Sequence, residues 1–114
     1  MEKLEYNKRM EEYAKTIYKI LSSFERQIDN PGFDMDEISP DVLGISKLRR
    51  DRYLQMLIDA GYIAGIRAKE LSNQTFNIIV TAPHITLKGL EFLAENRLMR
   101  RAYNFVKDAK DIIR

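Results

Sequence analysis

Four side chains in one short stretch have the chemistry to bind nucleic acid. Arg52 and Gln55 are three residues apart, which places them one turn apart on the same face of a helix. Arginine can pair with two acceptors of a guanine edge, and glutamine can pair with an adenine edge. Lys47 and Arg49 lie near the start of the same predicted helix, where they could hold phosphates. The spacing favours a helix that reads base pairs in a DNA major groove.

Two acids on this predicted helix argue for a different interpretation. At about 100° per residue, Asp51 and Asp59 fall on the same outer face as Arg52 and Gln55, where they would repel phosphates. The alternative is therefore a mixed-charge, solvated surface. The outer face also holds Leu48, and the buried side holds Leu54, Leu57 and Gly61, flanked by Tyr53 and Ile58.

Arg50 falls on the buried side of this helical wheel. Either its aliphatic stem leaves the edge of the core so that the guanidinium reaches water, or the first turn of the helix is irregular. We favour the first interpretation, because long cationic side chains commonly bury the stem and expose the charge.

The elements that follow predict a two-stranded wing. Ser46 should cap the third helix, which spans about 47–60, and Gly61 should end it. Residues 62–67 and 75–81 have strand character, with a polar tip at 68–74. We expect Pro83 to stop the second strand, and Arg67 and Lys69 of the wing to add contacts to a DNA backbone. Thr86 should cap a fourth helix.

The elements that precede complete the fold. Apolar residues at spacings of four and three predict a long first helix over about 3–27, which ends near residues 30–32. A short second helix spans 36–43 or starts only at Pro40, with Ser39 as its cap. The order predicts a mainly α, α+β fold: a winged helix-turn-helix with a two-stranded wing, a long N-terminal helix and an extra C-terminal helix at about 98–113.

The two end helices carry apolar stripes that need a partner. We expect them to cover each other, within one chain or in a homodimer. A two-fold dimer could place two recognition helices one DNA turn apart, near 34 Å. The predicted interface residues are Tyr6, Met10, Leu98, Phe105 and Ile112.

Length and composition restrict the remaining possibilities. The 114 residues suit one domain, with a core at about 10–96. The net charge is only +2, but residues 46–52 carry +3 and residues 97–114 carry +4, and such local clusters can attract a polyanion. The chain has no cysteine and one histidine, His84, without catalytic companions. We therefore expect no catalytic site, no metal, no cofactor and no small-molecule substrate.

Two further expectations concern location and cation binding. The N-terminus lacks an apolar signal core and no apolar run approaches a membrane span, so we expect a cytoplasmic protein without a membrane partner. Asp34, Asp36, Glu37 and Asp41 lack the glycine and terminal glutamate of a calcium loop, so we interpret them as caps and solvated acids.

Three pieces of the sequence are distinctive in combination. They are the turn Gly61-Tyr62-Ile63-Ala64-Gly65, the helix opening at 85–93 with Thr86, Lys88 and Gly89, and the tail with Ala102-Tyr103, Lys107 and Lys110-Asp111. Together they resemble the YjcQ-like family of small winged-helix proteins from Gram-positive bacteria and their prophages. The resemblance spans roughly residues 10–114. It implies the winged-helix fold and a phage-derived setting, and no established activity. The long first helix and Arg50 depart from the family pattern.

The sequence thus leaves two functions open. The first is a DNA-binding protein, of the kind found as prophage transcriptional regulators, with the third helix in the major groove of double-stranded DNA. The alternative is a non-enzymatic protein-protein interaction module built on the same fold.

Overall fold

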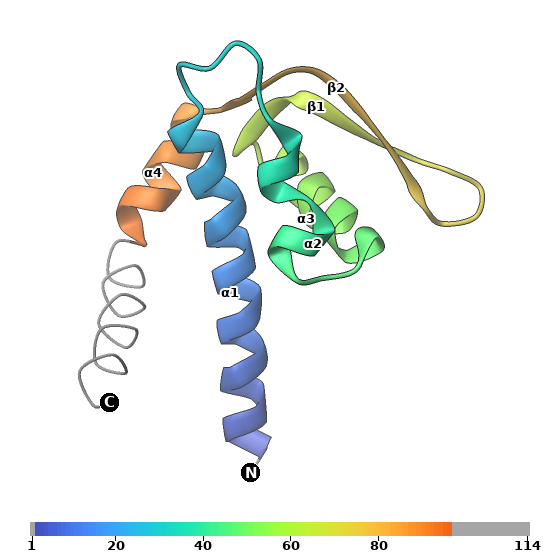
Figure 1. Ribbon diagram of the computed structural model, residues 1–114. Helices are drawn as coiled ribbons and strands as arrows, with labels where there is room; N and C mark the ends of the chain where they lie inside the picture. The colour runs from blue at the N-terminus through green and yellow to red at the C-terminus, as the bar shows by residue number, and fades with distance from the viewer. Residues whose placement is uncertain (1, 97–114) are drawn as a thin grey trace.

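The protein is a mainly helical α+β structure with a winged-helix arrangement (Figure 1). The computed structural model describes residues 2–96, and side chains from residue 12 onward. The predicted C-terminal helix at 98–113 lies outside the described residues. Within the described part, no helix is both long and apolar enough to cross a membrane. The elements are α1 Glu2–Arg26, the 3-10 helix η1 Met35–Ile38, α2 Pro40–Leu43, α3 Lys47–Asp59, β1 Ile63–Glu70, β2 Phe76–Ile85 and α4 Leu87–Glu95.

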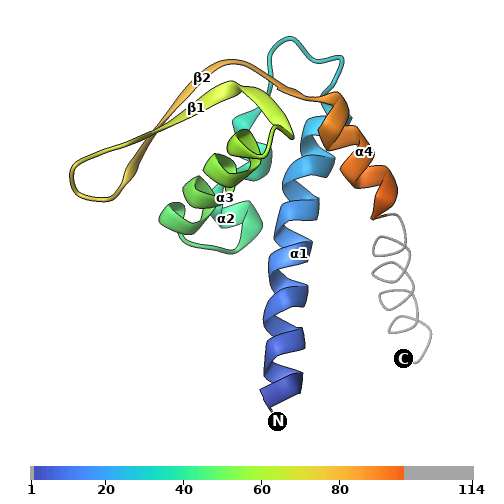
Figure 2. The same ribbon diagram turned by 180° about the vertical axis from the view of Figure 1, so that it is seen from behind.

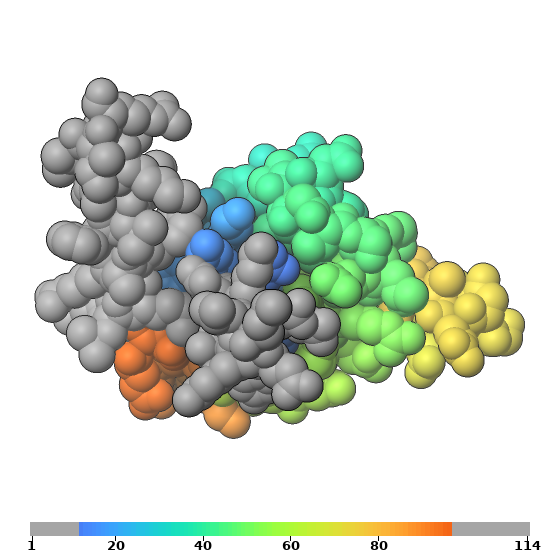
Figure 3. Space-filling view, turned by 90° about the horizontal axis from the view of Figure 1, so that it is seen from below, coloured from blue at the N-terminus to red at the C-terminus, as the bar shows by residue number. Residues whose placement is uncertain are grey.

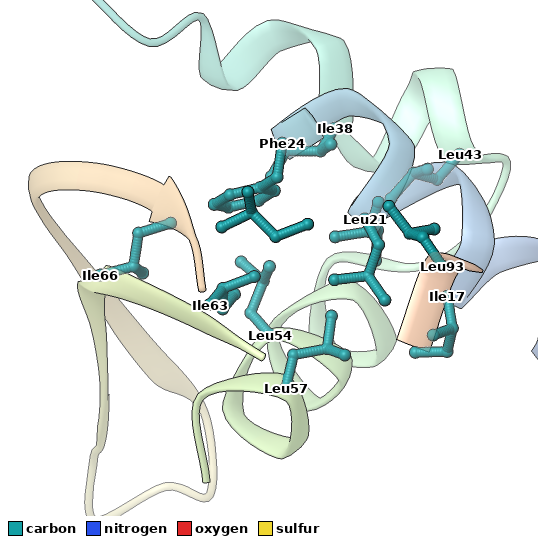
Figure 4. Packing of buried hydrophobic residues seen from close by; sticks show 12 residues of the cluster. Ile17, Leu21, Phe24, Ile38, Leu43, Leu54, Leu57, Ile63, Ile66 and Leu93 are labelled. Carbon is teal, nitrogen blue, oxygen red and sulfur yellow. The ribbon is translucent and has the colours of Figure 1, made fainter. Parts of the chain in front are cut away.

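The core forms around the C-terminal half of α1. Ile20, Leu21 and Phe24 are fully buried, at the spacing that the predicted stripe requires. Figure 4 shows side chains from η1, α3, β1 and α4 converging on this stripe. Burying each large apolar side chain contributes about 1.5–3 kcal/mol. Helix α1 is therefore the element on which the other elements pack.

The predicted helix caps are confirmed. The hydroxyls of Ser39 and Ser46 accept the backbone N–H groups of Val42 and Arg49, so α2 starts at Pro40 and α3 at Lys47. Helix α3 ends in a Schellman motif: the N–H of Tyr62 donates to the carbonyl of Leu57 at 2.9 Å, and that of Gly61 donates to Ile58. These local bonds set both ends of α3.

Helix α4 packs directly on the connection between α3 and β1. The Thr86 hydroxyl donates to the carbonyl of Gly61 at 2.6 Å and accepts the N–H of Gly89 at 3.1 Å. A methyl group at Gly89 would overlap the carbonyl oxygen of Tyr62, so only glycine permits this approach. The Thr-Leu-Lys-Gly sequence therefore joins α4 to the end of α3.

The second strand is longer than expected, and the prediction that Pro83 stops it is wrong. Strand β2 continues to Ile85, which pairs with Ile63 of β1. The register shifts between Ala64 and Ile66, so residues 81–83 bulge opposite a single residue, Gly65. Pro83 lies in this bulge, where its missing N–H breaks no ladder bond.

The tip of the wing is shorter than predicted. Strand β1 runs to Glu70 and β2 begins at Phe76, so the tip comprises residues 71–75 and not 68–74. Lys69, which the sequence placed in the tip, is therefore a strand residue paired with Asn77.

We expect Gly65→Ala to destabilise the fold by about 2 kcal/mol or more. Gly65 has a φ of +78°, and an added methyl group would overlap the carbonyl oxygen of Ala82 across the bulge. Urea unfolding followed by circular dichroism would measure the loss.

Gly32→Ala is the matched control. Its added methyl group would meet only the Asn30 side chain, at 3.7 Å, so the free energy of unfolding should change by less than about 0.5 kcal/mol. Equal effects of the two substitutions would contradict the bulge geometry.

Candidate nucleic-acid interface

Figure 2 shows α3 beneath the wing and beside α1. Most of the α3 side chains predicted to read DNA lie on its solvent-facing side, here called the outward face. Arg49, Arg52 and Asp59 are exposed, and Gln55 is half-buried. Leu48 is also exposed and adds an apolar contact of the kind that suits a thymine methyl group. Leu54 and Leu57 face the core as predicted. The face therefore combines two arginines, one amide, one carboxylate and one leucine.

The prediction that Asp51 lies on this face is wrong. Its side chain is 1% exposed, and it is bound by two cations. The Lys47 ammonium lies 2.7 Å from Oδ2 and the Arg50 Nε lies 2.8 Å from Oδ1. A buried carboxylate needs such partners, because desolvation costs several kcal/mol per ion. Of the two acids predicted for the outward face of α3, Asp59 remains there and Asp51 does not.

Both predicted interpretations of Arg50 are also wrong. The first turn of α3 is regular and capped, and only 11% of the Arg50 side chain is exposed, so its guanidinium is held mainly against the protein and does not extend freely into solvent. Instead its Nη1 donates to the carbonyl of Ile38 at 3.2 Å while Nε binds Asp51. The pair therefore connects α3 to η1, on the other side of the turn that contains α2.

Lys47 forms an ion pair and is also largely exposed to solvent. Its ammonium binds Asp51, yet 66% of its side chain remains exposed. A phosphate would have to compete with a carboxylate for this charge, which weakens Lys47 as a predicted phosphate contact.

Arg52 lies against the wing. Its guanidinium carbon is 5.7 Å from the centroid of the Phe76 ring, within cation–π range. Phe76 is itself 4% exposed, so the ring is a fixed support. Stacking occupies the face of the guanidinium and leaves its N–H groups, which point outward in the plane, able to bind acceptors.

The structure does not bring Arg67 and Lys69 together with Arg52. Residues paired across an antiparallel ladder share one face, and Phe76 pairs with Glu70 while Ile66 pairs with Val80. Phe76 and Ile66 are the buried members, so that face packs toward α3. Arg67 and Lys69 alternate with these residues and are exposed on the opposite face of the wing.

A groove between α1 and the α2–α3 turn contains cations that the sequence analysis missed. It has a volume of about 720 Å³, and Figure 3 shows α1 beside α2 and α3, with the wing at the far end. Lys15, Lys19 and Arg49 line it, with Glu12 as the one acid among the lining residues. We call it the basic groove. Its signal in the sequence is the spacing of Lys15 and Lys19, which share a helix face, but only the packing shows what they face.

A second, apolar groove lies between α1, α3 and α4. Its volume is about 360 Å³, and we call it the apolar groove. Tyr13 and Met56 are 46% and 45% exposed at its rim. The other lining residues are Ala14, Ile17, Tyr18, Leu57, Ala60, Tyr62, Phe92 and Asn96.

Two of the acids in residues 34–41 have structural roles, one as a helix cap and one as an ion-pair partner. The Asp34 carboxylate accepts the N–H of Asp36 at 2.9 Å and caps η1. Glu37 binds Arg26 at 2.8 Å and also accepts from Ser23, and the hydrogen bond from Arg26 lowers the pKa of Glu37.

Comparison with protein families identifies the chain. The model of the YjcQ protein family matches residues 18–112. The chain belongs to the YjcQ family. No curated protein and no solved structure matches it. The YjcQ match includes α1 from Tyr18 onward and every described element after it.

The predicted interface residues are not tested. Tyr6 and Met10 belong to the first turns of α1, and Leu98, Phe105 and Ile112 lie outside the described residues. Their role in a homodimer stays a prediction.

We expect Asp51→Asn to cost about 3 kcal/mol of folding stability, because it leaves the Arg50 charge buried without its partner. The double variant Arg50→Met, Asp51→Leu should recover most of this loss. Denaturant unfolding would measure both.

Asp59→Asn is the matched control on the same helix, and its exposed position predicts a change below about 0.5 kcal/mol. The buried pair would be disproved as a constraint if Asp51→Asn behaved like Asp59→Asn.

Proposed function

We propose that this YjcQ-family chain binds double-stranded DNA through the outward face of α3 and acts as a transcriptional regulator of prophage type. We further propose that it acts in the cytoplasm and by binding alone, without catalysis. The family establishes no activity, so the proposal rests on the residues of the site.

The burial of Asp51 carries this proposal. Two acids on α3 opposed DNA binding in the sequence, and one of them is inside the protein, neutralised by Lys47 and Arg50. Arg52 and Gln55 remain on the outward face with Arg49 beside them. These are the side chains that pair with guanine, adenine and phosphate.

The support of Arg52 favours base reading over a loose phosphate contact. Stacking on the buried Phe76 ring restricts the guanidinium, so less conformational entropy is lost when it binds a base. In this arrangement α3 enters the major groove. Arg67 and Lys69, on the wing face turned away from α3, are not part of this contact.

We expect Arg52→Ala to weaken binding to a preferred site by about 1–3 kcal/mol and to relax the base preference at one position. Fluorescence anisotropy with the preferred duplex and with variants at each base pair would measure both effects.

Arg26→Ala is the control, because it removes a charge of the same sign that does not lie on α3. Arg26 is the last residue of α1 and binds Glu37. It should leave base preference unchanged. An equal loss on every sequence with Arg52→Ala would make Arg52 a phosphate contact and contradict its proposed reading role.

The apolar groove favours a second function, an interaction module that pairs with a protein or with a second copy. Tyr13 and Met56 expose apolar surface beside buried Ile17 and Leu57, which is the pattern of an anchor site for an apolar side chain. A homodimer through this region would also serve the first function, because two-fold DNA sites need two recognition helices.

We expect the wild-type protein to have about twice the 13.4 kDa chain mass in light scattering, and Met56→Asp to shift it toward the monomer. A charge in the apolar groove would be desolvated on association.

Leu87→Asp is the matched control, because Leu87 is 72% exposed and does not line the groove. A monomeric wild type would rule out the dimer. Equal effects of the two variants would exclude the groove as the contact.

A further inference from the structure

The wing leaves one side of α3 poorly supplied with charge for DNA. A helix in the major groove has a phosphate strand on each side, about 12 Å apart. On the wing side, Arg67 and Lys69 lie on the face turned away from α3. Arg52, which stacks on Phe76, is assigned to base edges and not to a phosphate strand. The cations nearest to α3 must therefore be sought on its other side.

The basic groove lies on that other side. Arg49 is one turn before Tyr53 on the edge of α3 that faces α1, and both side chains line the groove. Lys15 and Lys19 line it from α1. Tyr13 and Tyr53 meet edge to face with ring centroids 5.6 Å apart, which fixes the wall between the two helices.

We propose that the basic groove holds the DNA phosphate strand on the α1 side of α3, with Lys19 and Arg49 as its principal contacts. This inference rests on the proposed DNA-binding function and extends the footprint to α1. Glu12 lines the same groove and opposes the phosphates, so it lowers affinity.

The salt dependence of binding tests this inference. Each phosphate contact contributes about 0.9 to the slope of log K against log salt concentration. We expect Lys19→Gln and Arg49→Gln each to reduce the slope by about 0.9 and the double variant by about 1.8, with the preferred sequence unchanged. Glu12→Gln should strengthen binding at low salt.

Arg26→Gln provides the control for net charge, because it removes one positive charge outside the groove and should leave the slope unchanged. Circular dichroism would confirm that each variant folds, which the exposed positions of Lys19 and Arg49 predict.

Three results are decisive. Reduced slopes with an unchanged preferred sequence support the inference. If the wild type binds but the Lys19→Gln and Arg49→Gln variants keep its salt slope, the basic groove does not hold a phosphate strand and the proposed function is left intact. This result would be seen if the groove bound an acidic protein segment. Absence of wild-type binding to any duplex at low salt overturns both.

Discussion

The buried Asp51 carboxylate constrains much of the candidate site. A charge with 1% exposure is stable only if its partners are fixed, and here both cations come from the same helix. Arg50 carries the constraint onward to the Ile38 carbonyl, which belongs to η1. The start of α3 is thereby tied to the segment that precedes it, and the outward face of α3 carries one acid fewer because Asp51 is buried.

The same constraint redistributes charge over α3. Lys47 forms an ion pair with Asp51, Arg52 stacks on the Phe76 ring, and Arg49 lines the basic groove beside α1. Three cations that are close in sequence therefore face three different surroundings. If α3 binds DNA, Arg52 and Gln55 are its polar side chains placed to read bases, while Arg49 belongs with the lysines of α1.

The order of elements could be predicted because its signals are local. Ser46, Thr86 and Gly61 form caps and a helix end from bonds within a few residues, so their types suffice. The strand past Pro83 could not be predicted, because the bulge depends on Gly65 of the other strand. The prediction for Asp51 was wrong because the wheel placed it on the outer face. On an ideal wheel Asp51 lies only about 20° from Ile58, seven residues later, and Ile58 flanks the buried side. The wing faces and both grooves required packing and register, which no local pattern contains.

The central claim is that α3 binds DNA with sequence preference. The most direct test is to bind the full chain to a random pool of short duplexes over a series of salt concentrations and to sequence the retained fraction. Our account predicts a steep fall of affinity with salt and an enriched motif. Weak binding that is flat with salt and selects no sequence would contradict it and direct attention to the apolar groove.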